Sequence, residues 1–173
     1  VLVLSDQHFP YSHPDIFRFL EAIKKEYQPD RVINIGDEID GHSISMHEGK
    51  DPDLLSPGKE LELAVTRIKR LKEIFPVMDL VESNHGSLVY RRAKFAGLPV
   101  RAIRSYADVL EVDPSSWRWH RDITLKLSNG QYCYFCHGKT GAPLRLSKSV
   151  SMSSVQGHFH SKFSINYWAN SRG

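Results

Sequence analysis

The chain has 173 residues, of which 40% are hydrophobic and 25% are charged. These fractions are typical of one globular domain and exclude collagen-like, coiled-coil and intrinsically disordered proteins. Lys and Arg together number 23 and Asp and Glu 20, and the net charge of +3 is too small to indicate nucleic-acid binding by itself. No apolar run is long enough for a membrane span and no charged segment precedes a hydrophobic stretch, so we expect a single domain over residues 1–173 and a cytoplasmic protein.

The first part of the chain alternates between expected strands and helices. Three short apolar runs are typical of buried strands: residues 1–5, 31–35 and 77–82. A helix is expected after the first run, because Pro14 suits a first helical position and Pro29 ends a stripe of apolar residues. Ser56 and Pro57 begin a second helix, which Pro76 ends. The order indicates β-α-β units with right-handed crossovers.

The pattern changes after Asp113, where a hairpin signal at residues 128–130 joins two runs of strand character, residues 123–127 and 132–135. The remaining expected elements are a loop at 41–55, helices at 87–96, 100–110 and 142–148, and strands at 150–156 and 162–169. Parallel units followed by hairpin-connected strands predict an α/β fold with a mixed sheet, or with two sheets packed between helices.

Two cysteines, Cys133 and Cys136, form a C-x-x-C pattern. In other settings this pattern indicates a redox pair or half of a zinc site. Here it lies in a run of strand character, where side chains three residues apart point to opposite faces. We therefore expect two buried free thiols.

The residues with the clearest chemistry directly follow expected strands. Five motifs share this placement: Asp6-Gln7-His8, Gly36-Asp37-Glu38-Ile39-Asp40, Asn84-His85, His137-Gly138 and Gly157-His158-Phe159-His160. Sites in open α/β sheets form beyond the carboxyl ends of strands, so these motifs can converge. Asp, Asn and His without a thiolate favour Mn, Fe, Ni or Zn over Ca or over Mg alone. Seven such ligands exceed the needs of one ion with open positions, so two ions about 3.5–4 Å apart are expected.

The five motifs, in this order, resemble the calcineurin-like metallophosphoesterase superfamily of the nuclease and phosphatase type. The resemblance extends over residues 1–161. It implies a four-layer α/β/β/α sandwich with mixed sheets, and hydrolysis of phosphate mono- or diesters by a hydroxide that two divalent metal ions activate. Mn is the first expectation for the metal, with Fe, Ni, Zn or Mg as alternatives.

The resemblance also implies a role for each motif residue. One metal would be bound by Asp6, His8 and His160, and the other by Asn84, His137 and His158, with Asp37 bridging the two. His85 is the implied catalytic residue, close to the substrate phosphate and the leaving oxygen. Asp40 would be hydrogen-bonded to His85 and favour its protonated form.

This chain departs from the family pattern at two places. Members usually show G-N-H followed by Asp or Glu, whereas this chain has Ser83-Asn84-His85-Gly86. The residue after Asp40 is Gly41 and not the Arg common among the protein phosphatases, which argues against that branch.

A basic stretch follows His85 and comprises Arg91, Arg92, Lys94, Arg101 and Arg104. These residues either form solvated helix faces or, with Arg91 and Arg92 as candidate phosphate contacts, bind a polyanionic substrate such as DNA, RNA or a nucleotide. Aromatic residues that could stack on bases, although such residues are more often core, are Tyr106, Trp117 and Trp119. Four histidines receive no ligand role: His13 precedes a helix, and His42, His47 and His120 are expected in loops.

The leading hypothesis is therefore a metal-dependent phosphoesterase whose substrate is a nucleotide or a nucleic acid. Within the enzymes, the alternative is a phosphatase of proteins or small molecules. From another class, the alternative is a non-catalytic scaffold of the same fold that has lost metal ligands, which retention of all seven ligands disfavours.

Overall fold

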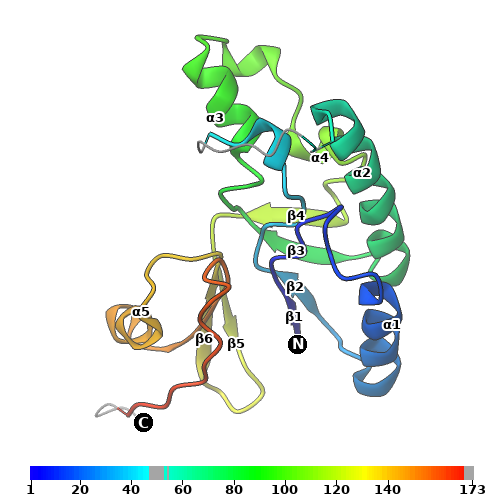
Figure 1. Ribbon diagram of the computed structural model, residues 1–173. Coiled ribbons are helices and arrows are strands. Elements are labelled where there is room, and N and C mark those ends of the chain that lie inside the picture. Colours follow the sequence, from blue (N-terminus) through cyan, green and yellow to red (C-terminus); the bar gives the residue numbers. More distant parts are fainter. Residues whose placement is uncertain (47–52, 54, 170–173) are drawn as a thin grey trace.

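The computed structural model describes residues 1–46, 53 and 55–169, and these residues form a mixed α/β fold with two sheets (Figure 1). The first sheet is entirely parallel, in the order β1 (Leu2–Leu4), β2 (Val32–Asn34), β3 (Met78–Val81) and β4 (Trp117–His120). The second sheet is mixed, in the order β5 (Ile123–Lys126), β6 (Tyr132–Cys136) and β7 (Ser153–Gln156). Strand β6 runs antiparallel to β5 and parallel to β7.

Five α-helices lie in the described part of the chain: α1 (Ile16–Tyr27), α2 (Pro57–Ile74), α3 (Leu88–Phe95), α4 (Tyr106–Val109) and α5 (Pro143–Val150). Two 3-10 turns, η1 (His42–Ile44) and η2 (Val100–Ala102), complete the elements. The expected start of α2 is confirmed, because the Ser56 hydroxyl accepts a hydrogen bond from the Lys59 backbone N–H at 3.4 Å. None of these helices combines the length and apolar character of a membrane span.

Most elements expected from the sequence are confirmed, four of them differ, and one strand was not expected. Strand β4 was not expected, and the helix predicted at 100–110 is divided into η2 and α4. The strand predicted at 150–156 begins only at Ser153, because α5 extends to Val150. The strand predicted at 162–169 is wrong, since no strand forms there and the side chains of its alternating apolar residues are 77–99% exposed: Phe163, Ile165 and Tyr167. The loop predicted at 41–55 contains η1, and its residues 47–52 and 54 lie outside the described residues.

Three clusters of buried apolar side chains hold these elements together. The largest joins α1 and α2 to the first sheet, for example through Leu20, Ile68 and Leu80. A second cluster joins residues of both sheets, and the third joins β6 to α5. The two cysteines are buried free thiols, as predicted, and they belong to different clusters: Cys133 to the second and Cys136 to the third. Opposite faces of β6 therefore contact different partners.

Candidate metal centre

The chain segments that follow β1 and β2 run side by side, and this pairing brings the first two motifs together. The backbone N–H of Asp6 donates to the Gly36 carbonyl at 3.0 Å, and that of His8 donates to the Asp37 carbonyl at 3.0 Å. One residue further, Phe9 forms a parallel bridge with Ile39. Asp6, His8 and Asp37 therefore lie at the carboxyl ends of adjacent parallel strands, as expected for sites in open sheets.

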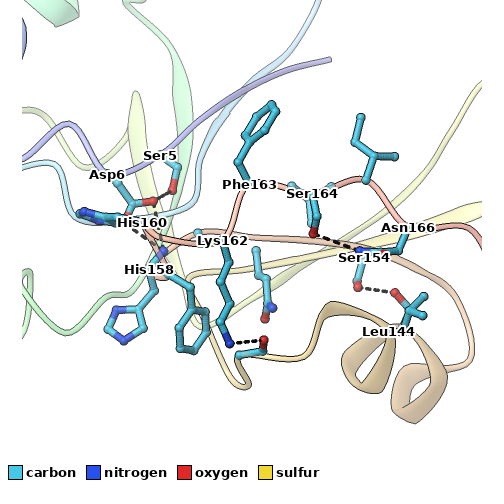
Figure 2. A pocket seen from close by; sticks show the side chains of 17 residues that line it. Ser5, Asp6, Leu144, Ser154, His158, His160, Lys162, Phe163, Ser164 and Asn166 are labelled. Atoms are coloured by element: carbon cyan, nitrogen blue, oxygen red, sulfur yellow. Dashed lines mark hydrogen bonds and ion pairs between the residues drawn. The ribbon is translucent and has the colours of Figure 1, made fainter.

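The structure brings the predicted ligands into two groups. Within each group, the candidate ligand atoms lie within 4.8 Å of one another. The first group consists of Asp6, His8 and His160, and the Asp6 carboxylate lies 3.0 Å from His160 Nε2. Figure 2 shows Asp6 and His160 side by side at the edge of a pocket that His158 also lines. This membership matches the ligand set predicted for one metal.

The second group consists of Asp37, His137 and His158. His137 Nε2 lies 2.9 Å from Asp37 Oδ2 and 2.7 Å from the side-chain oxygen of Asn84, which adds the last predicted ligand. The same Asp37 oxygen is 3.7 Å from His8 Nε2 of the first group. Asp37, whose side chain is 1% exposed, thus lies between the two groups, where the bridging carboxylate was predicted.

The catalytic residue predicted from the sequence, His85, lies beside both groups. Its Nε2 is 3.9 Å from Asp37 Oδ2, and its ring contacts the ring of His8 edge to face with centroids 4.7 Å apart. The prediction for its partner needs correction. The His85 Nδ1 contacts the backbone carbonyl of Asp40, while the Asp40 carboxylate is hydrogen-bonded to His8 Nδ1 at 2.9 Å. The Asp40 side chain therefore orients a predicted metal ligand, because a hydrogen bond to one ring nitrogen directs the other toward the metal.

Opposing effects set the protonation of these groups. Burial raises the pKa of Asp37, but the hydrogen bond and charge of His137 and the charge of His85 outweigh it and lower that pKa to about 2. Burial lowers the pKa of His137, but the hydrogen bond and charge of Asp37 outweigh it, and the net effect is a raised pKa. The pKa of His158 is lowered by burial and by the nearby His137. Asp37 is therefore ionised at neutral pH, as a metal ligand requires.

Backbone strain is concentrated in the same motifs. Four predicted ligands have positive φ angles, a conformation that residues other than glycine adopt rarely: Asp6 (53°), His8 (47°), Asp37 (56°) and His158 (73°). Such strain persists only where the surroundings enforce it, and it clusters at functional sites.

The glycines of the motifs are explained by close approach. Gly36 has φ of 102°, and a Cβ at this position would lie 2.9 Å from His137 Nδ1. A Cβ at Gly157 would overlap the carboxylate of Asp6. Larger residues at either position would therefore separate the two sheets at the candidate metal centre.

One residue that organises the site, Ser83, was not singled out from the sequence as a site residue. Its side chain is buried, and its hydroxyl oxygen accepts hydrogen bonds from the backbone N–H groups of Asp37 at 3.0 Å and Gly86 at 3.1 Å. The backbone N–H of His85 in turn donates to Asp37 Oδ1 at 3.1 Å. The only signal in the sequence was the occurrence of Ser where the resembled family usually has Gly.

The basic stretch divides into residues with different partners. Arg92 donates to the backbone carbonyls of Ile44 and Ser45, so it supports η1. Arg91 is exposed and donates to the backbone carbonyl of Asn84 at 2.8 Å, which places it beside the second group. Lys94, Arg101 and Arg104 are exposed on α3, on η2 and before α4.

The other histidines and the aromatic residues are mostly structural. His13 precedes α1 and accepts from the Asp15 backbone N–H, and His42 lies in η1, while His47 is outside the described residues. The loop prediction for His120 is wrong, because it ends β4, and its Nε2 is 3.1 Å from Asp79 Oδ1. Trp117 is fully buried, which confirms its core interpretation, and the partly buried Trp119 and Tyr106 pack against each other and against the largest cluster.

No protein-family model matches the chain. No curated protein matches it either.

Proposed function

We propose that this chain is a dinuclear metallophosphoesterase of the calcineurin-like type, which hydrolyses phosphate mono- or diesters. One observation carries the proposal: two groups of His and Asp side chains meet at a single buried carboxylate, Asp37, which belongs to the second group and lies 3.7 Å from His8 of the first. Five separate motifs form this cluster, and four of the candidate ligands have strained backbone. Such strain costs free energy of folding and is concentrated at functional sites.

The donor chemistry fits two divalent ions. The residues offer carboxylate, imidazole and amide donors and no thiolate, a set that suits Mn first and also Fe, Ni, Zn or Mg. Asp6, His8 and His160 would hold one ion, Asn84, His137 and His158 the other, and Asp37 both. Ions at these positions would activate water as a nucleophile near neutral pH and neutralise phosphoryl oxygens.

The protein's own residues position these groups and complete the reaction. The Asp40 carboxylate orients His8, and the Ile35 carbonyl orients His137 through its Nδ1 at 2.9 Å. His85 stabilises the charge that develops on the leaving oxygen or donates a proton to it. Arg91, exposed beside Asn84, contacts a phosphate of the substrate.

The substrate that we propose is a nucleotide or a nucleic acid. The support is the position of Arg91 and the exposed cations that follow it, which suit a polyanion. Phosphatase action on proteins or small molecules is the competing outcome of the same assay.

The finer architecture and the location belong to the same proposal. We propose that the two sheets form the inner layers of a four-layer α/β/β/α sandwich, within a single domain over residues 1–173. The support is the order of the three buried clusters, which join α1 and α2 to the first sheet, the two sheets to each other, and β6 to α5. We place the protein in the cytoplasm.

A substrate panel with parallel metal analysis tests the proposal. Protein supplemented with Mn should contain about two ions per chain and should hydrolyse a nitrophenyl phosphomonoester, its diester analogue, nucleotides or single- or double-stranded DNA or RNA. Absence of hydrolysis of every substrate would refute the enzyme. Absence of bound metal after supplementation would favour a non-catalytic scaffold of this fold.

A further inference from the structure

A cavity of about 630 Å³ lies directly beside the candidate metal centre. Four of its lining residues are immediate chain neighbours of His8, Asp40 or His85: Phe9, Ile39, Gly41 and Gly86. His85 itself lines the cavity. The space therefore adjoins the residue to which we assign the leaving oxygen, and its volume is within the range of small-molecule sites.

The remaining wall of the cavity is largely apolar and comes from four separate elements. Leu61 and Ala64 come from α2, Ile44 from η1, Val89 from α3 and Val109 from α4. Leu61 and Val89 have exposed side chains, at 36% and 39%, and so lie where the cavity meets solvent. A ligand could enter past these two residues.

The polar groups around the cavity already have partners within the protein. Both oxygens of the buried Glu60 carboxylate accept backbone N–H groups of η1 at 2.8 Å. Arg92 donates to the carbonyls of Ile44 and Ser45, and the Tyr106 hydroxyl lies 3.1 Å from Glu38 Oε2. These groups hold the wall in shape and leave an apolar surface for the occupant.

The occurrence of glycine after His85 keeps this space open. A Cβ at Gly86 would lie 3.2 Å from the Tyr106 ring and 3.2 Å from the Ser83 hydroxyl oxygen. The acidic residue usual at this position in the resembled family would extend from that Cβ among the cavity-lining residues. The glycine that departs from the family pattern thus lies at the edge of an apolar space beside His85.

We propose that this cavity binds the leaving group of the substrate, and that the preferred leaving group is an apolar aromatic alcohol. The inference rests on the proposed hydrolysis of phosphate esters, and it ranks aryl phosphate esters above the nucleotides and nucleic acids that the exposed cations favour. During hydrolysis the P–O bond to the aromatic group breaks, the attacking oxygen bonds to phosphorus, and the leaving oxygen takes its proton from His85 or solvent. A ring with a hydrogen-bonding edge, such as a nucleobase, would bury polar atoms without partners and bind less well.

Two substitutions that fill the cavity test this assignment. Val89→Trp places a large ring at the opening from α3, and Leu61→Trp does so from α2, because both residues line the cavity and are partly exposed. Val77→Trp is the matched control, because Val77 is 58% exposed and precedes β3, at the opposite end of the sheet from the candidate metal centre. Thermal unfolding of each variant verifies that it folds.

The first measurement is calorimetric binding of 2-naphthol to metal-free protein, which requires neither metal nor turnover. We expect saturable binding to one site, weakened about tenfold or more in both filled variants and unchanged in Val77→Trp. The second is the ratio of kcat/KM for 2-naphthyl phosphate to that for methyl phosphate with Mn present. This ratio should fall about tenfold or more in the filled variants.

The outcomes separate this inference from the proposed function. An active phosphoesterase that does not bind 2-naphthol, or whose filled variants bind it as the unsubstituted protein does, overturns the inference alone. A folded protein that binds 2-naphthol but hydrolyses no ester overturns the proposed function and with it the leaving-group role.

Discussion

The two sheets contribute to the candidate metal centre in different ways. The first sheet supplies Asp6, His8 and Asp37 from segments that pair through backbone hydrogen bonds beyond the strand ends. The second sheet supplies His158 and His160 from the turn after its edge strand β7, and the side chain of His160 is 58% exposed. Backbone pairing thus fixes the candidate ligands of the first sheet, whereas the two histidines from the second sheet lie in a turn.

His137 shows how the second sheet is aligned to the first. It follows β6, but its ring contacts the carbonyl of Ile35 at 2.9 Å and the carboxylate of Asp37 at 2.9 Å, both of which follow β2. The turn after β7 is attached by the His158 backbone N–H, which donates to the Asp6 carboxylate at 3.0 Å. The candidate metal centre is therefore itself a contact between the two sheets, and metal bound there should strengthen their association.

The largest effect is expected from Asp37→Asn. Asparagine lacks the charge that two ions would share, so the Mn content should fall below two per chain and phosphoester turnover should fall about 1,000-fold or more. Elemental analysis and a nitrophenyl phosphate assay measure both. The exposed Asp30→Asn variant is the matched control and should behave as the unsubstituted protein. Full metal content in Asp37→Asn would contradict the bridging position.

The next largest effect is expected from His85→Ala, which tests catalysis separately from metal binding. His85 belongs to the site of the first sheet but to neither of the predicted ligand sets, so turnover should fall about 100- to 1,000-fold while two Mn ions remain bound. His13→Ala removes an exposed histidine elsewhere and serves as the control. If His85→Ala lost metal, the histidine would be a ligand and the catalytic role would be wrong.

The sequence predicted the elements before Asp113 better than those after it. Strand ends and metal ligands leave local signals, such as Asp6-x-His8 after an apolar run, and these can be read without tertiary contacts. Strand β4 was missed although Trp117 and Trp119 alternate with Arg118 and His120, because this alternation is only four residues long. The side chains of Arg118 and His120 both pair with Asp79 of β3. Such a pairing between neighbouring strands leaves no signal in either strand alone.

Other features of the site could not be predicted because they depend on tertiary contacts. The His85 ring contacts the backbone carbonyl of Asp40 and not the Asp40 carboxylate, and this difference depends on backbone geometry. The supporting role of Ser83 likewise depends on contacts across the sheet. Hydrogen-bond partners therefore depend on the packed fold, whereas the candidate ligand residues can be identified from the motifs alone.

A smaller effect, on stability alone, is expected from Asp79→Asn in the first sheet. The Asp79 side chain is 3% exposed and contacts Arg31 at 2.7 Å, Arg118 at 3.0 Å and His120 at 3.1 Å. Because these partners are 41–51% exposed, we expect a loss of about 1–2 kcal/mol in the free energy of unfolding at pH 7. Urea unfolding measures it, and the Mn content should not change.

The pH dependence gives the control for this variant. Burial raises the pKa of Asp79, but hydrogen bonds from His120 and Arg31 and the charges of Arg31 and Arg118 outweigh it and lower the pKa from its ordinary 3.8. A lowered pKa in the folded state stabilises the protein above pH 3.8, and this contribution disappears as pH falls through the folded pKa. The stability difference between the two proteins should therefore shrink below pH 3.8. A difference that stays constant there would contradict the ionic cause.

The smallest effect is expected from Phe163→Ser, beyond the second sheet. The Phe163 side chain is 99% exposed and the segment forms no strand, so the free energy of unfolding should change by no more than about 0.5 kcal/mol. Phe135→Ala is the matched comparison, because Phe135 lies in β6 and is 3% exposed. Its loss should cost about 3–5 kcal/mol.

Urea unfolding of these two variants decides whether an apolar alternation in this chain stabilises a sheet. The alternation of Phe163, Ile165 and Tyr167 predicts a strand from periodicity, yet in the structure no part of the described chain covers these side chains. A loss above about 1 kcal/mol for Phe163→Ser would mean that the segment packs onto the second sheet in solution. A negligible loss means that periodicity alone, without a surface to bury it, is insufficient to add a strand to the edge of β7.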